Sequence, residues 1–552
     1  MWGAGRRWSW GAAVLAFALL WLVVYPIYLS ALEGISGPEG WTLDYIRAFF
    51  ARPNEWQALW GSLWISVATV VAAALIGVPL AFLFGRTEFP GRRVLGALVG
   101  LPVALPPLVG VLAFLFLYGE SGFAAHLVRW LTQSEETPWR LQGAGAILLV
   151  HAYSMYVYFY LFVRAALERM DGAALEAAAS LGASRWRILT RVTLPTLRPS
   201  LTGAALLTFT TSLASFSAPY IFGGGFRVMT TQVLATRLNG DTQLAMVETV
   251  ALTFIALAAL ALMGADPGEG VHSSGKGSAP ARHLARGAGR MLAMVGGWLF
   301  ALLLLLPHAT LLLLSFVPVG TWTIEAVPPA YTLANYTALA GDPERLRPLV
   351  NSLWMATIAT LASVAIAVWA GHLVVRRRAP GRRLIEILLA APWAVPGTVF
   401  ALALATAFSV DRPWALRVVL VGTLWILPLA YLIRNLPITS RPIFAGFRQL
   451  DPGLDEAAAG LGATRWTILR RVTLPLLAPA LAAAGALAFV TALGDFVTSV
   501  LLYTYDTRPL SLEILASLRS GDVGVAAVYG VLLMLASATV FLLGSRTGST
   551  SR

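Results

Sequence analysis

The chain has 552 residues, of which 58% are hydrophobic and 12% are charged, and its mean hydropathy is +0.73. Soluble domains carry about twice this charged fraction, so the composition excludes a water-soluble protein and indicates one that is solvated by lipid. The net charge of +13 does not indicate a nucleic-acid-binding protein, because the basic residues lie in short runs between apolar segments. The absence of cysteine excludes disulfides and cysteine nucleophiles, and the six histidines show no metal-binding spacing.

Apolar stretches of about 20 residues predict twelve membrane-spanning helices. The expected spans are 10–32, 59–85, 95–118, 143–165, 201–223, 244–264, 292–316, 349–375, 384–409, 414–434, 479–503 and 523–544. The first span follows Arg6 and Arg7, as in a cleaved signal peptide, but it is longer than the apolar core of about 7–15 residues in such peptides. We therefore expect an uncleaved first helix.

Lys and Arg are distributed unevenly between the expected loops. With the N-terminus inside, most of the 40 basic residues fall on the cytoplasmic side, including the runs Arg92–Arg93, Arg376–Arg378 and Arg382–Arg383. The positive-inside rule then predicts that both termini are cytoplasmic.

The chain divides into two similar halves. Residues 265–291 are rich in Gly, Ser, Ala and Pro without an apolar period, which predicts a flexible cytoplasmic linker between a first repeat, 1–264, and a second repeat, 292–552. The segment EAAASLGASRWRILTRVTLP at 176–195 matches EAAAGLGATRWTILRRVTLP at 456–475. Six spans in each half is an even number, so the repeats are expected to be parallel and related by an axis along the membrane normal.

Each matching segment lies in an expected loop on the basic side. The Glu-Ala-Ala-Ala run favours a helix, Gly182 or Gly462 permits a turn, and Pro195 or Pro475 stops or kinks the chain before the next span. This pattern predicts two short helices at an angle across the cytoplasmic face. Helices that lie among the lipid headgroups, anchored by tryptophan, are the alternative, but duplication of the loop favours a site for a symmetric partner.

The Glu-Ala-Ala…Gly…Leu-Pro pattern resembles the signature loop of the permease subunits of bacterial binding-protein-dependent ABC importers, and the resemblance extends from about Ser62 to the C-terminus. It implies an all-α polytopic fold of the type I importer permease in the bacterial cytoplasmic (inner) membrane. It also implies two copies of an ABC ATPase subunit and an extracytoplasmic solute-binding protein as partners. In that family the loop is a coupling helix that docks on the ATPase. The implied docking residues are Glu176, Ala177, Ala178, Gly182, Arg185, Glu456, Ala457, Ala458, Gly462 and Arg465.

The chain itself is not expected to be an enzyme. A string that resembles a phosphate-binding loop, at 270–277, lacks the final Ser or Thr and follows no strand, so ATP hydrolysis is expected on a partner chain. No cofactor and no metal site are expected. An ion-coupled secondary transporter is the alternative class, although such a transporter has no use for paired docking loops.

Asp495 is the clearest charged residue within an expected span, and Ser215 is its counterpart in the first repeat. Both lie in the fifth span of their half, which lines the pore in the family that the chain resembles, so we expect them in the translocation path. A carboxylate that is hydrogen-bonded near a helix end is the alternative for Asp495. Prolines are expected to break the third span of each half, as hinges or as fixed kinks. They are Pro102, Pro106, Pro107, Pro392 and Pro396.

The cargo is suggested by resemblance alone. The fused two-repeat arrangement resembles both iron(III) permeases and thiamine permeases, and the segments 215–225, 494–496 and 508–515 are more similar to the ferric group. Iron(III) is therefore the expected cargo, while thiamine, polyamine and phosphonate stay open.

Overall fold

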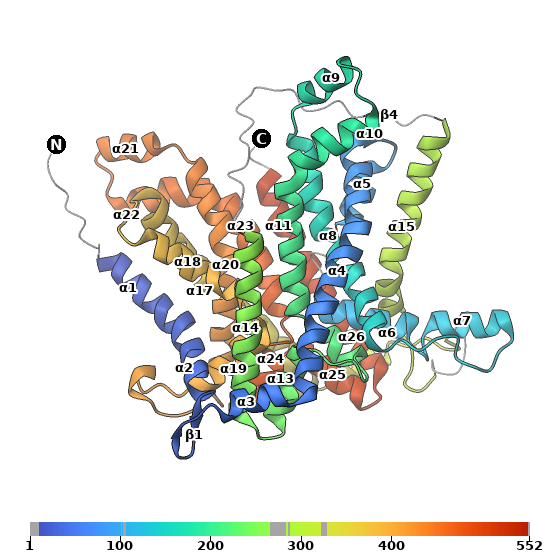
Figure 1. The fold of residues 1–552 in the computed structure, drawn as a ribbon, viewed down its shortest axis with the longest axis horizontal. Helices are drawn as coiled ribbons and strands as arrows, with labels where there is room; N and C mark the ends of the chain where they lie inside the picture. Colours follow the sequence, from blue (N-terminus) through green and yellow to red (C-terminus); the bar gives the residue numbers. More distant parts are fainter. Residues whose placement is uncertain are drawn as a thin grey trace.

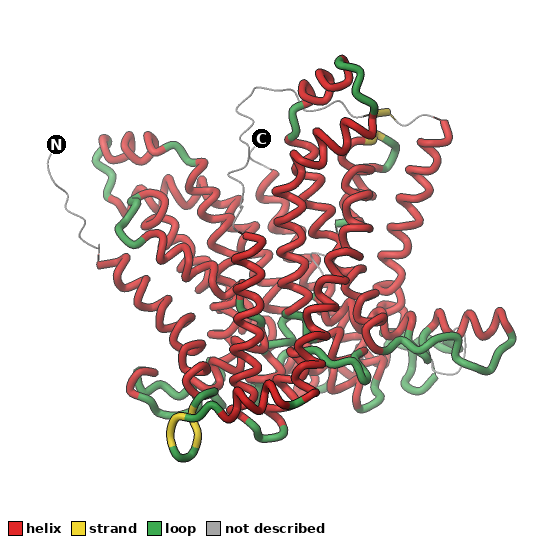
Figure 2. The backbone as a smooth tube through the Cα atoms, in the orientation of Figure 1, coloured by secondary structure: helices red, strands yellow, loops and turns green. Residues whose placement is uncertain are grey.

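A computed structural model describes residues 10–100, 102, 106–264, 283–284, 287–321 and 328–549. These residues are almost entirely helical, and most of the long helices run between two ends of the molecule (Figures 1 and 2). Two small strand pairs are present in the described part of the chain. β1 (Ser36–Gly37) pairs antiparallel with β2 (Gly40–Trp41), and β3 (Thr87–Glu88) pairs parallel with β4 (His283–Leu284).

The described part of the first half contains fourteen α-helices, some of which are segments of longer helical rods. They are α1 (Trp10–Leu19), α2 (Tyr25–Glu33), α3 (Asp44–Ala51), α4 (Pro53–Arg86), α5 (Arg92–Val99), α6 (Pro107–Tyr118), α7 (Phe123–Thr132), α8 (Gly143–Arg169), α9 (Gly172–Ser180), α10 (Arg185–Ile188), α11 (Leu194–Leu213), α12 (Ser217–Phe222), α13 (Met229–Leu238) and α14 (Thr242–Gly264). The π-helical turns Leu20–Val24 and Leu189–Thr193 join α1 to α2 and α10 to α11.

The second half repeats most of this order. Its helices are α15 (Gly287–Leu314), α16 (Ala334–Ala340), α17 (Pro343–Gly371), α18 (Arg382–Ala394), α19 (Gly397–Ala407), α20 (Ile426–Gln449), α21 (Pro452–Gly460), α22 (Arg465–Ile468), α23 (Leu474–Leu493), α24 (Ser499–Leu502), α25 (Leu510–Arg519) and α26 (Val523–Ser549). The π-helical turns His372–Arg376 and Leu469–Thr473 extend α17 and join α22 to α23, and Pro413–Ala415 forms a 3-10 turn.

Each of the twelve expected spans has a counterpart among the described helices. Nine helices in the described ranges are long and apolar enough to cross a membrane, or ten if the bent pair of α18 and α19 is one span. The remaining two are α11, which is rich in Thr and Ser, and α20, which carries three arginines. These polar residues lower the mean hydropathy of the two helices. Both helices nevertheless lie in the bundle, because α11 packs against α4 and α8, and α20 packs against α17 and α23. Each half therefore contains six bundle positions.

Several span limits differ from the sequence prediction. The span expected at 414–434 is a helix at Ile426–Gln449, and the span expected at 201–223 is a helix at Leu194–Leu213. A hydropathy window follows apolar composition, whereas a helix ends where its backbone hydrogen bonds end. Pro195 does not stop the chain either, since α11 continues through it from Leu194 to Leu213.

The third position of each half is broken, as the prolines predict. In the second half α18 and α19 meet at 110° on either side of Val395 and Pro396. In the first half α5 ends at Val99 and α6 begins at Pro107.

The largest apolar core joins the two halves. Its buried members include Leu19 and Phe216 from the first half and Phe400 and Tyr529 from the second. The first helical rod of each half packs against the other half, α2 on α19 and α15 on α6. The halves therefore fold as one body with their long axes side by side (Figure 1).

Most of the expected linker, 265–291, lies outside the described residues, and so does the string at 270–277. The described part of the linker contains regular secondary structure, whereas the sequence predicts a flexible segment. His283–Leu284 is a strand beside β3, and α15 begins at Gly287, so the last residues of the predicted linker are helical. These residues are exposed, and they form the first turn of α15, which continues without a break to Leu314.

Candidate coupling loops and translocation path

The first loop is shaped by hydrogen bonds within a few residues. The side chain of Asp171 accepts a hydrogen bond from the backbone N–H of Ala173 at 3.0 Å and caps α9. At the other end Gly182 has φ +76°, and the N–H of Ala183 donates to the carbonyl of Ala178 at 3.1 Å. Ser184 then caps α10 by accepting from Arg187 N–H at 3.3 Å. The local sequence thus specifies a helix, a left-handed turn and a second helix.

The second loop has the same construction. Asp451 accepts from Gly453 N–H at 2.9 Å, and Gly462 has φ +82°. Ala463 N–H donates to Ala458 at 3.1 Å, and Thr464 accepts from Thr467 N–H at 3.2 Å. The predicted pair of short helices is therefore confirmed in both halves.

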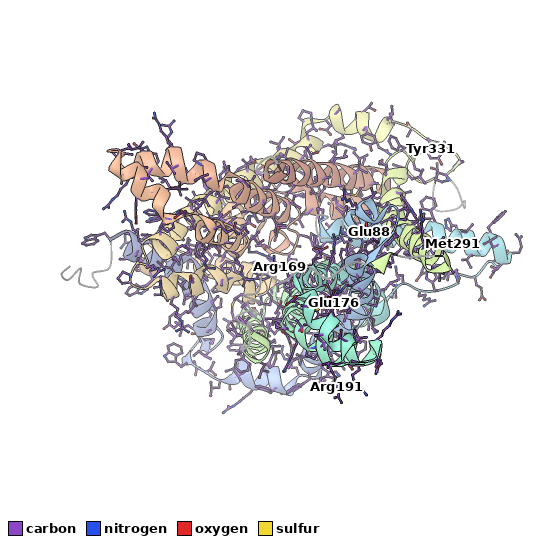
Figure 3. The ribbon with its side chains drawn as sticks, turned by 90° about the horizontal axis from the view of Figure 1, so that it is seen from above. Glu88, Arg169, Glu176, Arg191, Met291 and Tyr331 are labelled. Carbon is purple, nitrogen blue, oxygen red and sulfur yellow. The ribbon has the colours of Figure 1, made fainter. Side chains whose placement is uncertain are left out.

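Both loops project from the same end of the molecule, called here the loop end. Figure 1 shows α9 and α10 at the top beside α5, and α21 and α22 at the top left, while α3, α7, α13 and α25 lie at the opposite end. Figure 3 looks onto the loop end, with Glu176 and Arg191 labelled on the first loop. Both predicted loops thus lie on one face, as parallel repeats require.

The predicted docking residues are accessible. Glu176, Ala177, Gly182 and Arg185 are exposed and Ala178 is half-buried, and their counterparts Glu456, Ala457, Gly462, Arg465 and Ala458 repeat this pattern. Two residues that the sequence analysis missed are also exposed, Leu181 at 88% and Leu461 at 89%. An apolar side chain between the alanine run and the glycine was the available signal. Exposed leucines at equivalent places fit a contact with another protein.

Each loop is attached to the second long helix of its own half. In the second half Asp455 of α21 pairs with Arg376, at the end of the α17 rod, over 3.5 Å. In the first half Leu175 replaces this aspartate and packs into an apolar cluster, while Arg86 at the end of α4 donates to the sulfur of Met170 at 3.2 Å. Each loop therefore contacts the end of α4 or of the α17 rod, directly or through the residue that precedes it.

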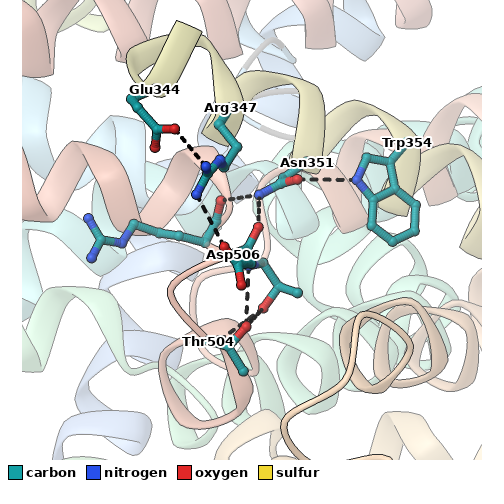
Figure 4. A network of polar contacts seen from close by, with 8 residues as sticks. Glu344, Arg347, Asn351, Trp354, Thr504 and Asp506 are labelled. Atoms are coloured by element: carbon teal, nitrogen blue, oxygen red, sulfur yellow. Dashed lines mark hydrogen bonds and ion pairs between the residues drawn. The ribbon is translucent and has the colours of Figure 1, made fainter.

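The opposite end of the same long helix holds the segment that follows the fifth helix. Ser352 of α17 accepts from Leu510 N–H at 2.7 Å, and Ser62 of α4 accepts from Met229 N–H at 2.7 Å. In the second half the amide of Asn351 also donates to the carbonyl of Asp506 at 2.7 Å (Figure 4). In each half one long helix thus connects a loop at one end with a clamped segment at the other.

Asp495 ends the fifth helix of the second half and organises the chain break after it. Its carboxylate accepts from Thr498 N–H at 2.9 Å and Ser499 N–H at 3.2 Å, and it pairs with Arg434 of α20 at 3.3 Å. The side chain is 7% exposed. The carboxylate is thus hydrogen-bonded next to a helix end and holds the backbone that follows it.

Ser215 occupies the equivalent place in the first half with a neutral network. Its hydroxyl lies 2.9 Å from Nε2 of the buried His151 of α8. Nδ1 of His151 lies 3.2 Å from the hydroxyl of Thr69 and 3.1 Å from that of Ser212. His151 is therefore a hydrogen-bonding core residue, and both fifth helices are held at their break by a residue of the fourth long helix.

The residues after Ser215 and Asp495 close the space between the halves. The rings of Phe216 and Phe496 are buried and their centroids lie 5.7 Å apart. Tyr220 stacks on Phe216 at 5.0 Å, and Arg519 of α25 lies over Tyr220 at 5.4 Å. We call Phe216, Tyr220 and Phe496 the aromatic layer. These rings bring the ends of the two fifth helices into contact across the halves.

The proline-containing third position borders the same place. A Cβ atom added to Gly494 would lie 2.6 Å from Cβ of Pro106, which comes from the other half. Gly494 is therefore required for this close approach. The sequence analysis missed the aromatic layer, although both phenylalanines follow directly after the residues that it singled out.

Replacing both Phe216 and Phe496 by alanine is expected to make the protein leaky. Removing two rings from a closed layer opens a path, so passive entry of a small solute into vesicles should rise at least about tenfold, as for a barrier about 1.4 kcal/mol lower. Phe447→Ala is the matched control, because Phe447 is equally buried but packs between α17 and α20 within one half. Equal leakage in the control and the double variant would show that lost packing, not an opened layer, is the cause.

Comparison with known proteins agrees with this geometry. The family model described as "Binding-protein-dependent transport system inner membrane component" matches twice, at residues 77–265 and 363–546. The probable ABC transporter permease protein y4fN of Sinorhizobium fredii is 30% identical over 545 residues, which are 97% of this chain and 95% of that protein.

Two further relatives differ in how much of the chain they match. The ferric transport system permease protein FbpB of Actinobacillus pleuropneumoniae is 27% identical over 96% of this chain and 77% of its own length. The thiamine transport system permease protein ThiP of Brucella abortus is 31% identical over 37% of each chain. One match of the family model falls on each structural repeat, and each match includes one of the two loops. The chain belongs to the family of inner membrane components of binding-protein-dependent transport systems.

Proposed function

We propose that this chain forms the translocation path of an ABC importer that is driven by two ATPase subunits, one on each loop. The observation that carries the proposal is the pair of equally built, exposed loops at one end of the molecule, each attached to a long helix. The docking residues are Glu176, Ala177, Ala178, Gly182 and Arg185 on the first loop and their counterparts on the second. ATP hydrolysis is assigned to the partner chains.

The long helices α4 and α17 supply the mechanical connection. An α-helix of 34 residues such as α4 is about 50 Å long. ATP-driven closure of the two ATPase subunits draws the loops together, and the long helices carry this movement to the clamped segments beyond the aromatic layer. The free energy comes from the difference in affinity of the ATPases for the two states of the permease. Asp495 and Ser215 hold the ends of the fifth helices that border the path.

The loop end is assigned to the cytoplasm, and with it both termini. Arginines are concentrated at this end, in the loops and beside them, which satisfies the positive-inside rule. They include Arg185, Arg187, Arg191, Arg376, Arg377, Arg378, Arg382, Arg383, Arg465, Arg470 and Arg471. The solute-binding protein then meets the opposite end. The two repeats, 1–264 and 292–552, form the two walls of the path.

Iron(III) is the cargo we propose. The ferric permease FbpB is similar along 96% of this chain, whereas the thiamine permease ThiP is similar along 37%. Among the described residues no group of three or more His, Asp or Glu side chains could hold a metal ion. Thiamine, polyamine and phosphonate are the competing cargoes.

Uptake by reconstituted vesicles tests the proposal. Vesicles that contain this chain, the ATPase and a ferric-iron-binding protein should accumulate iron(III) when ATP is supplied on the loop side. Vesicles without the ATPase should show only background entry. Uptake that persists without the ATPase and follows an ion gradient would instead identify an ion-coupled secondary transporter. ATP-dependent uptake of thiamine but not of iron(III) would reject the proposed cargo alone.

A further inference from the structure

A pocket of about 540 Å³ opens at the loop end of the second half. It lies where the α17 rod ends, α18 begins and α20 ends. Its lining residues are Val374, Val375, Arg378, Arg382, Glu386 and Arg448. The pocket is separate from the docking residues of the second loop and from the aromatic layer.

The charges of the pocket are strongly positive. Arg448 pairs with Glu386 over 3.5 Å, which neutralises one arginine. Arg378 and Arg382 form no ion pair with a residue in the described ranges, so two guanidinium groups face the pocket uncompensated. Arg378 also has φ +45°, a left-handed conformation that a non-glycine residue adopts at an energetic cost. These features together fit a site for an anion.

The equivalent place in the first half has the opposite charge. Glu88 stands where the second half has Arg378, and Glu168 stands where it has Arg448. Each carboxylate is paired, Glu88 with Arg92 at 3.2 Å and Glu168 with Arg164 at 3.1 Å. The first half therefore neutralises its own charges. Arg92 stands where the second half has Arg382, so only Arg378 and Arg448 distinguish the second half. Structural need does not explain these two arginines, because the first half builds the same fold with carboxylates at their places.

The apolar part of the pocket lining indicates what kind of anion enters. The buried Val374 and the half-buried Val375 line the pocket, and both lie at the end of the membrane-spanning α17 rod. A positive pocket with apolar side chains of a membrane-spanning helix in its wall matches a phospholipid, with a charged headgroup and adjacent acyl chains. A soluble phosphate would use the arginines but not the apolar surface.

We propose that the pocket formed by Arg378, Arg382 and Arg448 binds a phosphate group, supplied by the headgroup of an anionic phospholipid of the inner leaflet. The assignment to the inner leaflet rests on the proposed orientation of the loop end. Binding itself does not, because it can be measured with the purified chain. Failure of ATP-driven transport and failure of lipid binding are therefore separate results.

Lipid binding to the detergent-purified full chain tests this inference. Phosphatidylglycerol should bind more tightly than phosphatidylcholine and should raise the thermal unfolding midpoint. Each arginine removed should lower the binding constant about fivefold, so Arg378→Gln with Arg448→Gln should weaken it about 25-fold. Glu386→Gln should tighten binding, because it removes the carboxylate that competes for Arg448. Loss of a merely structural residue would not produce this increase.

Three controls decide the outcome. Arg129→Gln with Arg237→Gln removes two arginines at the opposite end, one half-buried and one exposed, and should leave phosphatidylglycerol binding unchanged. Inorganic phosphate at millimolar concentration should not raise the unfolding midpoint. A phosphate effect as large as the lipid effect, abolished by the pocket substitutions, would identify a soluble anion as the ligand and overturn the lipid assignment. Equal binding of both lipids, or no response to the pocket substitutions, would overturn the site.

Discussion

Substituting proline for both Gly182 and Gly462 is expected to release the ATPase and reduce ATP-driven uptake to the background of vesicles without ATPase. Proline holds φ near about −65°, whereas these glycines have φ +76° and +82°. Proline also removes the N–H that Gly182 donates to Ala179 at 2.9 Å and that Gly462 donates to Ala459 at 2.9 Å. Both turns must then refold, so the helix pairs lose the angle at which they would meet the ATPase. Co-purification of the ATPase measures the result.

The chain offers a matched control at its opposite end. Gly240 and Gly521 follow α13 and α25, have φ +88° and +80°, and donate to Arg237 and Leu518. At all four glycines an added Cβ atom would have no neighbouring atom within 4 Å. Proline at both control sites imposes the same backbone change away from the loops, so the ATPase should stay bound. An ATPase that co-purifies equally with both double variants would refute the docking assignment.

Substituting serine for Arg434 is expected to destabilise the protein strongly. Asp495 would keep its buried carboxylate without the cation 3.3 Å away. Removing one partner of a buried ion pair costs about 3 kcal/mol or more, because the remaining charge is left uncompensated. The midpoint of thermal unfolding, followed by tryptophan fluorescence in detergent, should fall clearly below that of the unchanged protein.

The first half suggests a second substitution that should restore part of the lost stability. Ser154 and Ser215 occupy the places of Arg434 and Asp495, so Arg434→Ser with Asp495→Ser copies an arrangement that this fold already accepts. The double variant should therefore be more stable than Arg434→Ser alone, with a coupling of about 1–3 kcal/mol between the two sites. Strictly additive losses would mean that the ion pair does not link α20 to the break after α23.

The two halves share a fold but carry different charged groups at two equivalent places. The fold tolerates a neutral serine–histidine network in one half and an arginine–aspartate pair in the other, at the same break of the fifth helix. It likewise tolerates paired carboxylates in one half and unpaired arginines in the other, at the same end of the second helix. Internal repetition thus provides a built-in control for separating structural from functional residues.

Sequence alone determined the features that depend on neighbouring residues. The apolar runs require lipid, the two similar halves require parallel repeats, and the alanine runs with Gly182 and Gly462 specify a short helix and a left-handed turn. Capping, turn formation and hydropathy act over a few residues, so they can be recognised without a fold. The prolines before α6 and α19 predicted broken third helices for the same reason.

Only the tertiary structure decided which distant residues meet. It brought Arg434 to Asp495, Phe216 to Phe496 and Pro106 to Gly494, in each case from different helices. It also gathered Arg378, Arg382 and Arg448 around one pocket, although sequence analysis treated such arginines as general cytoplasmic anchors. Long-range contacts follow from how whole helices pack in three dimensions, and no local pattern encodes the partner of a side chain hundreds of residues away.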